Sequence, residues 1–167
     1  MSVSVTLQQV LSAVETLEGN TPPISAAKRV VTWDALSIKG VAMNAGSAVP
    51  ATKIAGGQVA LANGAKTLDL TALAGLGANG TTVDFTGLKL QALYLENPAT
   101  NEYEISVAPG AANGYAFSGA DSKLTLAPGQ SVLLYGADEA PDVAAGAKTL
   151  DFAGTQAEAF NILLIAG

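Results

Sequence analysis

Near its start, the chain places apolar residues at the spacing of a helix. Leu7, Val10, Leu11, Val14 and Leu17 recur every three or four positions, which is typical of one face of an amphipathic helix. Thr6 and Gln9 have the spacing of a capping box at the beginning of such a helix. Glycine and two prolines follow at positions 19, 22 and 23 and favour its end. The pattern therefore predicts a helix over residues 7 to 18.

After Pro23 the pattern changes to short apolar stretches separated by turn residues, which is typical of an all-β sandwich or barrel. Asn-Gly pairs at positions 63, 79 and 113 favour chain reversals. The predicted strands are 29–33, 37–43, 58–61, 67–70, 82–85, 89–95, 103–107, 115–117, 123–126, 131–135, 149–152 and 160–165. So many short strands exceed one sheet and favour two packed sheets. We expect an N-terminal helix or attachment arm over residues 1–22 and a β-sandwich domain over 23–167.

Two of these strands are apolar on both of their faces. Most strands alternate apolar and polar residues, as half-exposed strands do, but Ser131–Tyr135 and Phe160–Ile165 contain uninterrupted apolar runs. Such strands need cover on both sides. The sandwich core would supply one cover, and the N-terminal helix or a neighbouring subunit the other.

A short unit of the form Thr-apolar-Asp-apolar recurs along the chain. It begins at Thr67, Thr82 and Thr149, and the first and last copies are each preceded by Gly-Ala-Lys. In an extended strand this unit would place threonine and aspartate on the wet face and the apolar residues on the dry face. Repeated use of one strand entry explains the copies better than duplication, since their spacing is irregular.

Composition excludes several classes of function. The 167 residues include no Cys and no His, so thiolate or imidazole catalysis and metal binding through these side chains are excluded. Charged residues make up 13%, about half of the usual ~25%, which favours a surface largely covered by other subunits. The net charge of −6 with scattered basic residues argues against nucleic-acid binding. No apolar run approaches the ~18 residues of a membrane span, and no cofactor is expected.

The remaining candidates for chemistry are acidic or aromatic. Two carboxylates across a cleft would suffice for glycoside hydrolysis, and the available acids are Glu96, Glu102, Glu104, Asp121 and Asp142. The neighbouring Asp138, Glu139 and Asp142 are candidate Ca²⁺ ligands, although they lack the spacing of a calcium loop. Trp33 and the four tyrosines are candidates for stacking on sugars, but isolated aromatics are more typical of packing.

Over roughly residues 66 to 167 the chain resembles small virion-associated proteins of tailed bacteriophages. The resemblance is carried by strand and turn patterns, namely Leu68-Asp69-Leu70-Thr71-Ala72-Leu73, Val83-Asp84-Phe85, Leu88-Lys89, Leu93-Tyr94-Leu95-Glu96-Asn97, Ile105-Ser106-Val107, 126–134 and 162–167. It implies a jelly-roll β-sandwich that serves in the particle as a capsid decoration or cement protein, or as part of a spike. It transfers no site residues and does not include the predicted helix.

These observations predict a non-enzymatic virion structural protein, made in the cytoplasm of the host bacterium. It would form dimers or trimers and dock on the major capsid protein or another virion protein, thereby stabilising the head shell. The expected partner-binding residues are Leu7, Val10, Leu11, Val14 and Leu17, whose stripe suits either a partner or the chain's own domain. The alternatives are a carbohydrate-binding spike or receptor-binding module and a polysaccharide-degrading enzyme.

Overall fold

The computed structural model describes residues 3–9, 13–17, 29–33, 38–136 and 138–167. The protein is mainly β, with antiparallel sheets and very little helix. The chain divides into two compact units: a smaller one over Val5–Met43, here called the arm, and a larger one formed mainly by Asn44–Gly167. The boundary expected at residue 22 lies outside the described residues.

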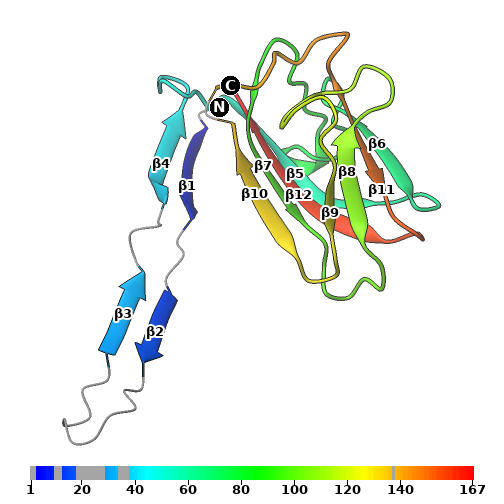
Figure 1. Ribbon diagram of the computed structural model, residues 1–167. Helices are drawn as coiled ribbons and strands as arrows, with labels where there is room; N and C mark the ends of the chain where they lie inside the picture. Colours follow the sequence, from blue (N-terminus) through cyan, green and yellow to red (C-terminus); the bar gives the residue numbers. More distant parts are fainter. Residues whose placement is uncertain (1–2, 10–12, 18–28, 34–37, 137) are drawn as a thin grey trace, which may run out of the picture. The chain divides into compact units, whose positions relative to one another are not determined.

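The arm contains two separate ladders of two strands each. Strand β1 (Ser4–Gln9) pairs with β4 (Ile38–Asn44), and β2 (Ala13–Leu17) pairs in antiparallel fashion with β3 (Arg29–Trp33) (Figure 1). Register is fixed in the second ladder, where Ala13 lies opposite Trp33 and Leu17 opposite Arg29.

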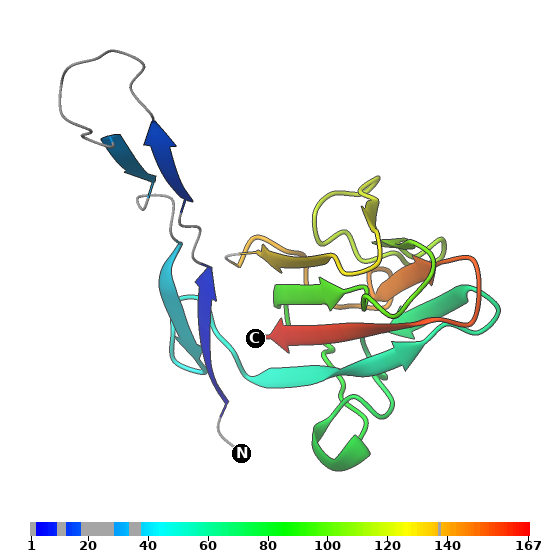
Figure 2. The same cartoon turned by 90° about the horizontal axis from the view of Figure 1, so that it is seen from below.

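The larger unit is a β-sandwich-like pair of four-stranded sheets (Figures 1 and 2). Sheet I has the order β10-β7-β12-β5, from β10 (Ser131–Tyr135), β7 (Leu90–Glu96), β12 (Ala159–Ala166) and β5 (Lys53–Ala60). Sheet II has the order β6-β11-β8-β9, from β6 (Ala65–Asp69), β11 (Thr149–Ala153), β8 (Ile105–Pro109) and β9 (Leu124–Leu126). A single 3₁₀ turn, η1 (Ala78–Gly80), interrupts the connection from β6 to β7.

The two sheets share one hydrophobic core. Its buried members come from seven of the eight strands and from the β6–β7 connection, which contributes the fully buried Phe85, while the partly buried Val132 and Leu134 of β10 pack against it. Phe152 of sheet II stacks on Phe160 of sheet I, with ring centroids 4.2 Å apart. Within the described part of the chain, no helix has the length and apolar character needed to cross a membrane.

The helix predicted over residues 7 to 18 is wrong, because β1 and β2 occupy Ser4–Gln9 and Ala13–Leu17. An isolated helix of this length is marginal in water, and no second helix is available in the described residues to pack against it. Valine and threonine at positions 5, 6, 14 and 16 favour strands. The pairing partners in β3 and β4 lie more than ten residues further along, beyond the reach of a local pattern.

Most of the predicted strands are confirmed. Arg29–Trp33 and Ser131–Tyr135 match β3 and β10 in full, whereas residues 82–85 and 115–117 lie outside the named strands. In both segments aromatic side chains enter the core: Phe85 and Tyr115 are fully buried. The Leu90 amide donates a hydrogen bond to the Tyr115 hydroxyl (2.9 Å), which itself donates to the Pro141 carbonyl (2.6 Å).

The first and last of the three Thr-apolar-Asp-apolar units pair with each other in sheet II, whereas the unit at Thr82 lies outside the named strands. Strands β6 and β11 run antiparallel, with Asp69 opposite Thr149 and Thr67 opposite Asp151. Thr67 Oγ1 donates to Asp151 Oδ1 at 2.6 Å. The repeated strand entry therefore supplies two neighbouring strands whose threonine and aspartate side chains lie on one face.

Candidate docking face on sheet I

The outer surface of sheet I carries an apolar band. In β12 the alternate residues Phe160, Ile162 and Leu164 are buried in the core, so Asn161, Leu163 and Ile165 lie on the opposite, outer surface. Strand register extends this surface into two cross-strand rows. The rows, which together define the apolar band, are Leu133–Tyr94–Leu163 and Tyr135–Ala92–Ile165–Ile54.

The band remains accessible at several of its side chains. Leu163 is 40% exposed and Ile54 is 37% exposed, and these are the exposed large hydrophobic residues among positions 3–7, 41–136 and 138–167. Leu133, Tyr94 and Tyr135 are half-buried, whereas Ala92 and Ile165 are buried. The solvent-facing residues of an antiparallel sheet are usually polar, so the apolar residues of this band are unusual for a surface that faces water.

A glycine in the neighbouring strand leaves room for Leu163. Gly56 continues the first row into β5, and a Cβ atom built on Gly56 would lie 2.8 Å from Leu163 Cδ1. The same Cβ would lie 3.0 Å from the Ile162 carbonyl oxygen, so a larger residue at position 56 would displace the Leu163 side chain from its present place. The Gly56-Gly57 pair, which by its residue types favours a chain reversal, therefore lies inside β5, where Gly56 leaves space on the outer face of the sheet.

A polar row borders the band. Register aligns four residues across the sheet, which are Ser131, Glu96, Asn161 and Gln58. The Glu96 carboxylate accepts hydrogen bonds from Asn161 Nδ2 (3.1 Å) and from the Tyr94 hydroxyl (3.2 Å). The acidic group is therefore engaged within the sheet, and the phenol of Tyr94 joins the apolar band to its polar edge.

Sheet II has an outer surface of the opposite character. Its cross-strand rows contain small or polar residues, namely Ala65–Ala153–Ser106–Thr125 and Thr67–Asp151–Ala108. A shallow hollow of about 200 Å³ on this side is lined by polar side chains that include Glu104, Ser106 and Lys123. Of the two sandwich sheets, sheet I is therefore the one that presents large apolar side chains outward.

A loop is anchored beside the end of the band that Tyr135 occupies. The register between β12 and β7 shifts at Ile165/Ala166, close to Gln91 in β7. The fully buried Gln91 donates through Nε2 to Asp138 Oδ1, at 2.8 Å, in the loop that follows β10. Lys89 Nζ lies 3.4 Å from Asp138 Oδ2. The hydrogen bond from Gln91, followed by the Lys89 ammonium, lowers the pKa of the Asp138 carboxyl below its ordinary value. These contacts tie the loop after β10 to the middle of sheet I.

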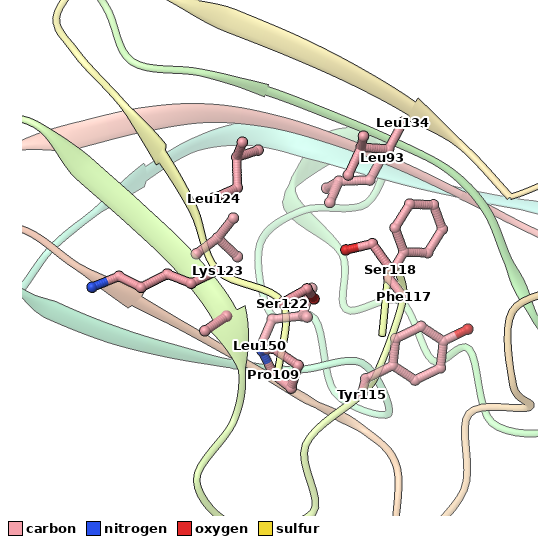
Figure 3. Close-up of a pocket in the computed structure, with 12 residues that line it drawn as sticks. Leu93, Pro109, Tyr115, Phe117, Ser118, Ser122, Lys123, Leu124, Leu134 and Leu150 are labelled. Atoms are coloured by element: carbon pink, nitrogen blue, oxygen red, sulfur yellow. The ribbon is translucent and has the colours of Figure 1, made fainter. Parts of the chain in front are cut away.

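An apolar cavity of about 170 Å³ lies between the two sheets, on the side of β9 and β10. Leu93 and Leu134 line it from sheet I and Leu124 from sheet II, while Phe117 comes from the β8–β9 connection (Figure 3). The Lys123 ammonium points away from the other labelled side chains (Figure 3). The cavity therefore offers apolar contact with little polar chemistry inside.

The predicted partner-binding residues fall on the arm. Leu7 lies in β1 and is 5% exposed, and Val14 and Leu17 lie in β2 opposite Thr32 and Arg29. Val10 and Leu11 lie outside the described residues. The role of these five residues as a contact stripe stays a prediction. Strands β1 and β2, and not a helix, carry Leu7, Val14 and Leu17.

The two strands predicted to be apolar on both faces, 131–135 and 160–165, both belong to sheet I. Their inner residues contribute to the core and their outer residues to the apolar band. Sequence reasoning missed Ile54 and Tyr94, which β5 and β7 add to the same surface. The run Leu90-Gln91-Ala92-Leu93-Tyr94-Leu95 was an available signal, since it is nearly as apolar as the two strands that were singled out.

The acidic candidates are distributed over different elements. Glu96 lies in β7, Glu104 lines the hollow on sheet II, and Asp142 forms an isolated bridge with Lys89. Among described residues, no group of three acidic side chains lies close enough to hold a metal ion, and this includes Asp138, Glu139 and Asp142. Trp33 lies in β3 of the arm.

Comparison with known proteins adds no relative. The chain matches no protein-family model, no curated protein and no solved structure at a significant level.

Proposed function

We propose that this chain is a non-enzymatic structural protein of a tailed-phage virion, most simply a decoration or cement protein that oligomerises on the head shell and stabilises it. The observation that carries the proposal is the apolar band on the outer surface of sheet I. Apolar residues on the outer face of an antiparallel sheet need a cover, because that face is usually polar; here Leu163 is exposed beside the half-buried Tyr94, and Ile54 is exposed on the edge strand β5.

The strand order supports a jelly roll as the specific form of the sandwich. If β5 to β12 are counted as strands one to eight, sheet I has the order 6-3-8-1 and sheet II the order 2-7-4-5. The chain changes sheet at every connection except that from β8 to β9. Eight strands wound between two sheets in this way are typical of jelly rolls, an architecture common to viral capsid and lectin domains.

The size of the band favours attachment through many copies. Four strands about 4.8 Å apart and two residue rows give an area on the order of 300 Å², against ~800 Å² per partner in a standard interface. Burial contributes roughly 25 cal/mol per Å² of apolar surface, but association also costs translational and side-chain freedom. A single contact of this size would be weak, whereas repeated contacts on a lattice add through multivalency.

Light scattering with two matched variants tests the proposal. Leu163→Asp places a charge at the centre of the band, and Ala153→Asp places one on the exposed centre of sheet II. We expect the unaltered chain and Ala153→Asp to form dimers or trimers and to bind empty heads of the phage that encodes it. Leu163→Asp should lose both properties while keeping its fold. An unaltered chain that stays monomeric and ignores the heads would refute the proposal.

A carbohydrate-binding spike module is the second candidate, because Tyr94 and Tyr135 lie on the same outer surface as the polar row. Glu96 and Asn161 would supply hydrogen bonds beside the Tyr94 ring, which is the combination that sugar stacking requires. A glycan array tests this candidate: tight binding that Tyr94→Ala abolishes, without loss of oligomers, would favour it over the decoration role. Absence of any bound glycan would reject it.

A further inference from the structure

The sandwich is closed along one side and open along the other. Beside β5 and β6, the connection to β7 buries Leu70, Leu73 and Phe85 in the core. Beside β9 and β10, the inward residues Leu124, Val132 and Leu134 are only partly buried. The apolar cavity of about 170 Å³ lies on this open side, so the core is incomplete here.

Strand β10 also has an unpaired edge. The Asn97 amide donates to the Gln130 carbonyl (2.9 Å) and the Gly136 amide to the Gln91 carbonyl (2.8 Å). Since backbone groups of a strand alternate in direction, residues 130, 132, 134 and 136 bond to β7. Ser131, Leu133 and Tyr135 therefore direct their N–H and C=O groups away from β7, and no described strand pairs with them. Such an edge is a template for an added strand.

The ladders of the arm lack strands to pair with, just as the edge of β10 does. Each of its two ladders contains only two strands, and a two-stranded ladder is marginally stable in water unless more strands or packing complete it. Strands β2 and β3 have five residues each, the same length as β10.

Charge does not oppose contact between an arm and a sandwich. Residues 5–43 contain three basic and three acidic side chains, so their net charge is zero. The remaining residues contain five basic and eleven acidic side chains, and the entire net charge of −6 resides there. A neutral arm that approaches a sandwich therefore meets no net-charge repulsion, unlike the approach of two units that each carry −6.

We propose that the arm of one copy adds as a strand to the free edge of β10 in a second copy and places one apolar side chain in the cavity. This inference rests on the proposed function and names the partner at one of its contacts. Strand addition takes affinity from main-chain hydrogen bonds and specificity from pockets for alternate side chains. The cavity is close in volume to the ~150 Å³ apolar cavity that accommodates benzene, so it fits one leucine or phenylalanine side chain.

Because the chain contains no cysteine, thiol cross-linking between two differently substituted copies tests this proposal. One copy carries Ser131→Cys on the β10 edge, and the other carries Thr16→Cys or Thr32→Cys in the arm. A short bismaleimide is added to the mixture. The matched control replaces Ser131→Cys with Lys66→Cys, which lies on the exposed edge strand β6 of sheet II. A chain carrying both substitutions reports whether the arm reaches its own β10.

We expect heterodimers with Ser131→Cys and their loss with Lys66→Cys. The variant Ser131→Pro removes an N–H that points away from β7, while the hydrogen bonds between β10 and β7 remain. It should abolish addition of the arm. Excess Ser131→Pro protein should therefore fail to reduce cross-linking between the two cysteine variants, whereas excess unaltered chain should reduce it. Equal cross-linking at Lys66→Cys, or cross-links only within one chain, would overturn the inference. If cross-links fail while Leu163→Asp still abolishes oligomers, this inference falls and the proposed function stands. A monomer at all concentrations overturns both.

Discussion

The outer surfaces of the two sheets differ although both sheets enclose the same core. Sheet I turns leucine, isoleucine and tyrosine outward, while sheet II turns alanine, serine, threonine and aspartate outward. Both sheets alternate correctly on their inner surfaces, so folding of the sandwich does not explain the difference. A sheet that is apolar on both of its faces needs a second cover, which is why we propose sheet I as the docking face.

The largest effect is expected from the core that both surfaces depend on. Phe152→Ala removes the ring that stacks on Phe160 between the sheets and should lower the free energy of unfolding by about 3–5 kcal/mol. Urea denaturation followed by circular dichroism measures it. Phe152→Leu, which keeps more of the volume, should cost less. A loss under ~1 kcal/mol for the alanine variant would mean that the two sheets do not share one packed core.

A smaller loss is expected where a buried amide joins the two sheets. Asn97 follows β7 and is fully buried, and its Nδ2 donates to the carbonyls of Tyr103 (3.0 Å) and Leu126 (2.9 Å). Asn97→Leu leaves both carbonyls without this donor and should cost about 1–3 kcal/mol in urea denaturation. The matched control is Asn161→Ala, which loses only a half-buried bond to Glu96 and should change stability by about 0.5 kcal/mol or less.

Substitutions on the outer surface of sheet I should weaken association between copies while they change the stability of the fold little. The double variant Leu163→Ala/Ile54→Ala trims the exposed part of the apolar band and should change the free energy of unfolding by less than ~1 kcal/mol. Its association constant, measured by sedimentation velocity, should nevertheless fall. Thr125→Ala on the outer surface of sheet II should change neither quantity. Equal loss of association in both variants would remove the distinction between the sheets.

The smallest effect concerns pH and sheet II. Burial raises the pKa of Asp69, but hydrogen bonds from Lys148 (2.6 Å) and from Thr71 outweigh it, so this pKa is lowered overall. An aspartate with a lowered pKa in the folded protein stabilises above its unfolded value near 4, and this stabilisation disappears as pH falls through the folded value. Asp69 remains partly exposed, so we expect at most ~1 kcal/mol.

Urea denaturation between pH 6 and about 2 measures that contribution. Asp69→Asn should flatten part of the acid-side decline in stability. Glu102→Gln, at an exposed carboxyl outside the named strands, serves as the control. An identical decline in Asp69→Asn and the unaltered chain would show that the Lys148–Asp69 pair contributes nothing.

Most strands and turns of the sandwich can be predicted from the sequence, because turn residues and the alternation of apolar and polar residues depend on a few neighbouring positions. Asn63 and Gly64 both adopt positive φ, at 52° and 78°, as the predicted reversal requires, and β10 begins and ends where its apolar run does. The segments at 82–85 and 115–117 carry the same local signal, yet they pack an aromatic residue into the core without joining a ladder. Ladder membership depends on a distant partner, which alternation cannot reveal.

The sequence by itself determined that the protein is mainly β, that the chain reverses at the Asn63-Gly64 pair, and that residues 131–135 and 160–165 need cover on both faces. Only the tertiary structure decided that these two strands share one sheet with β7 between them, so that their outer residues merge into a single band. It also decided that residues 4–9 and 13–17 are strands. The physical reason is the same in both cases. The spacing of apolar residues indicates which faces of a segment must be buried, whereas hydrogen bonds to strands remote in the sequence determine which segments lie beside it.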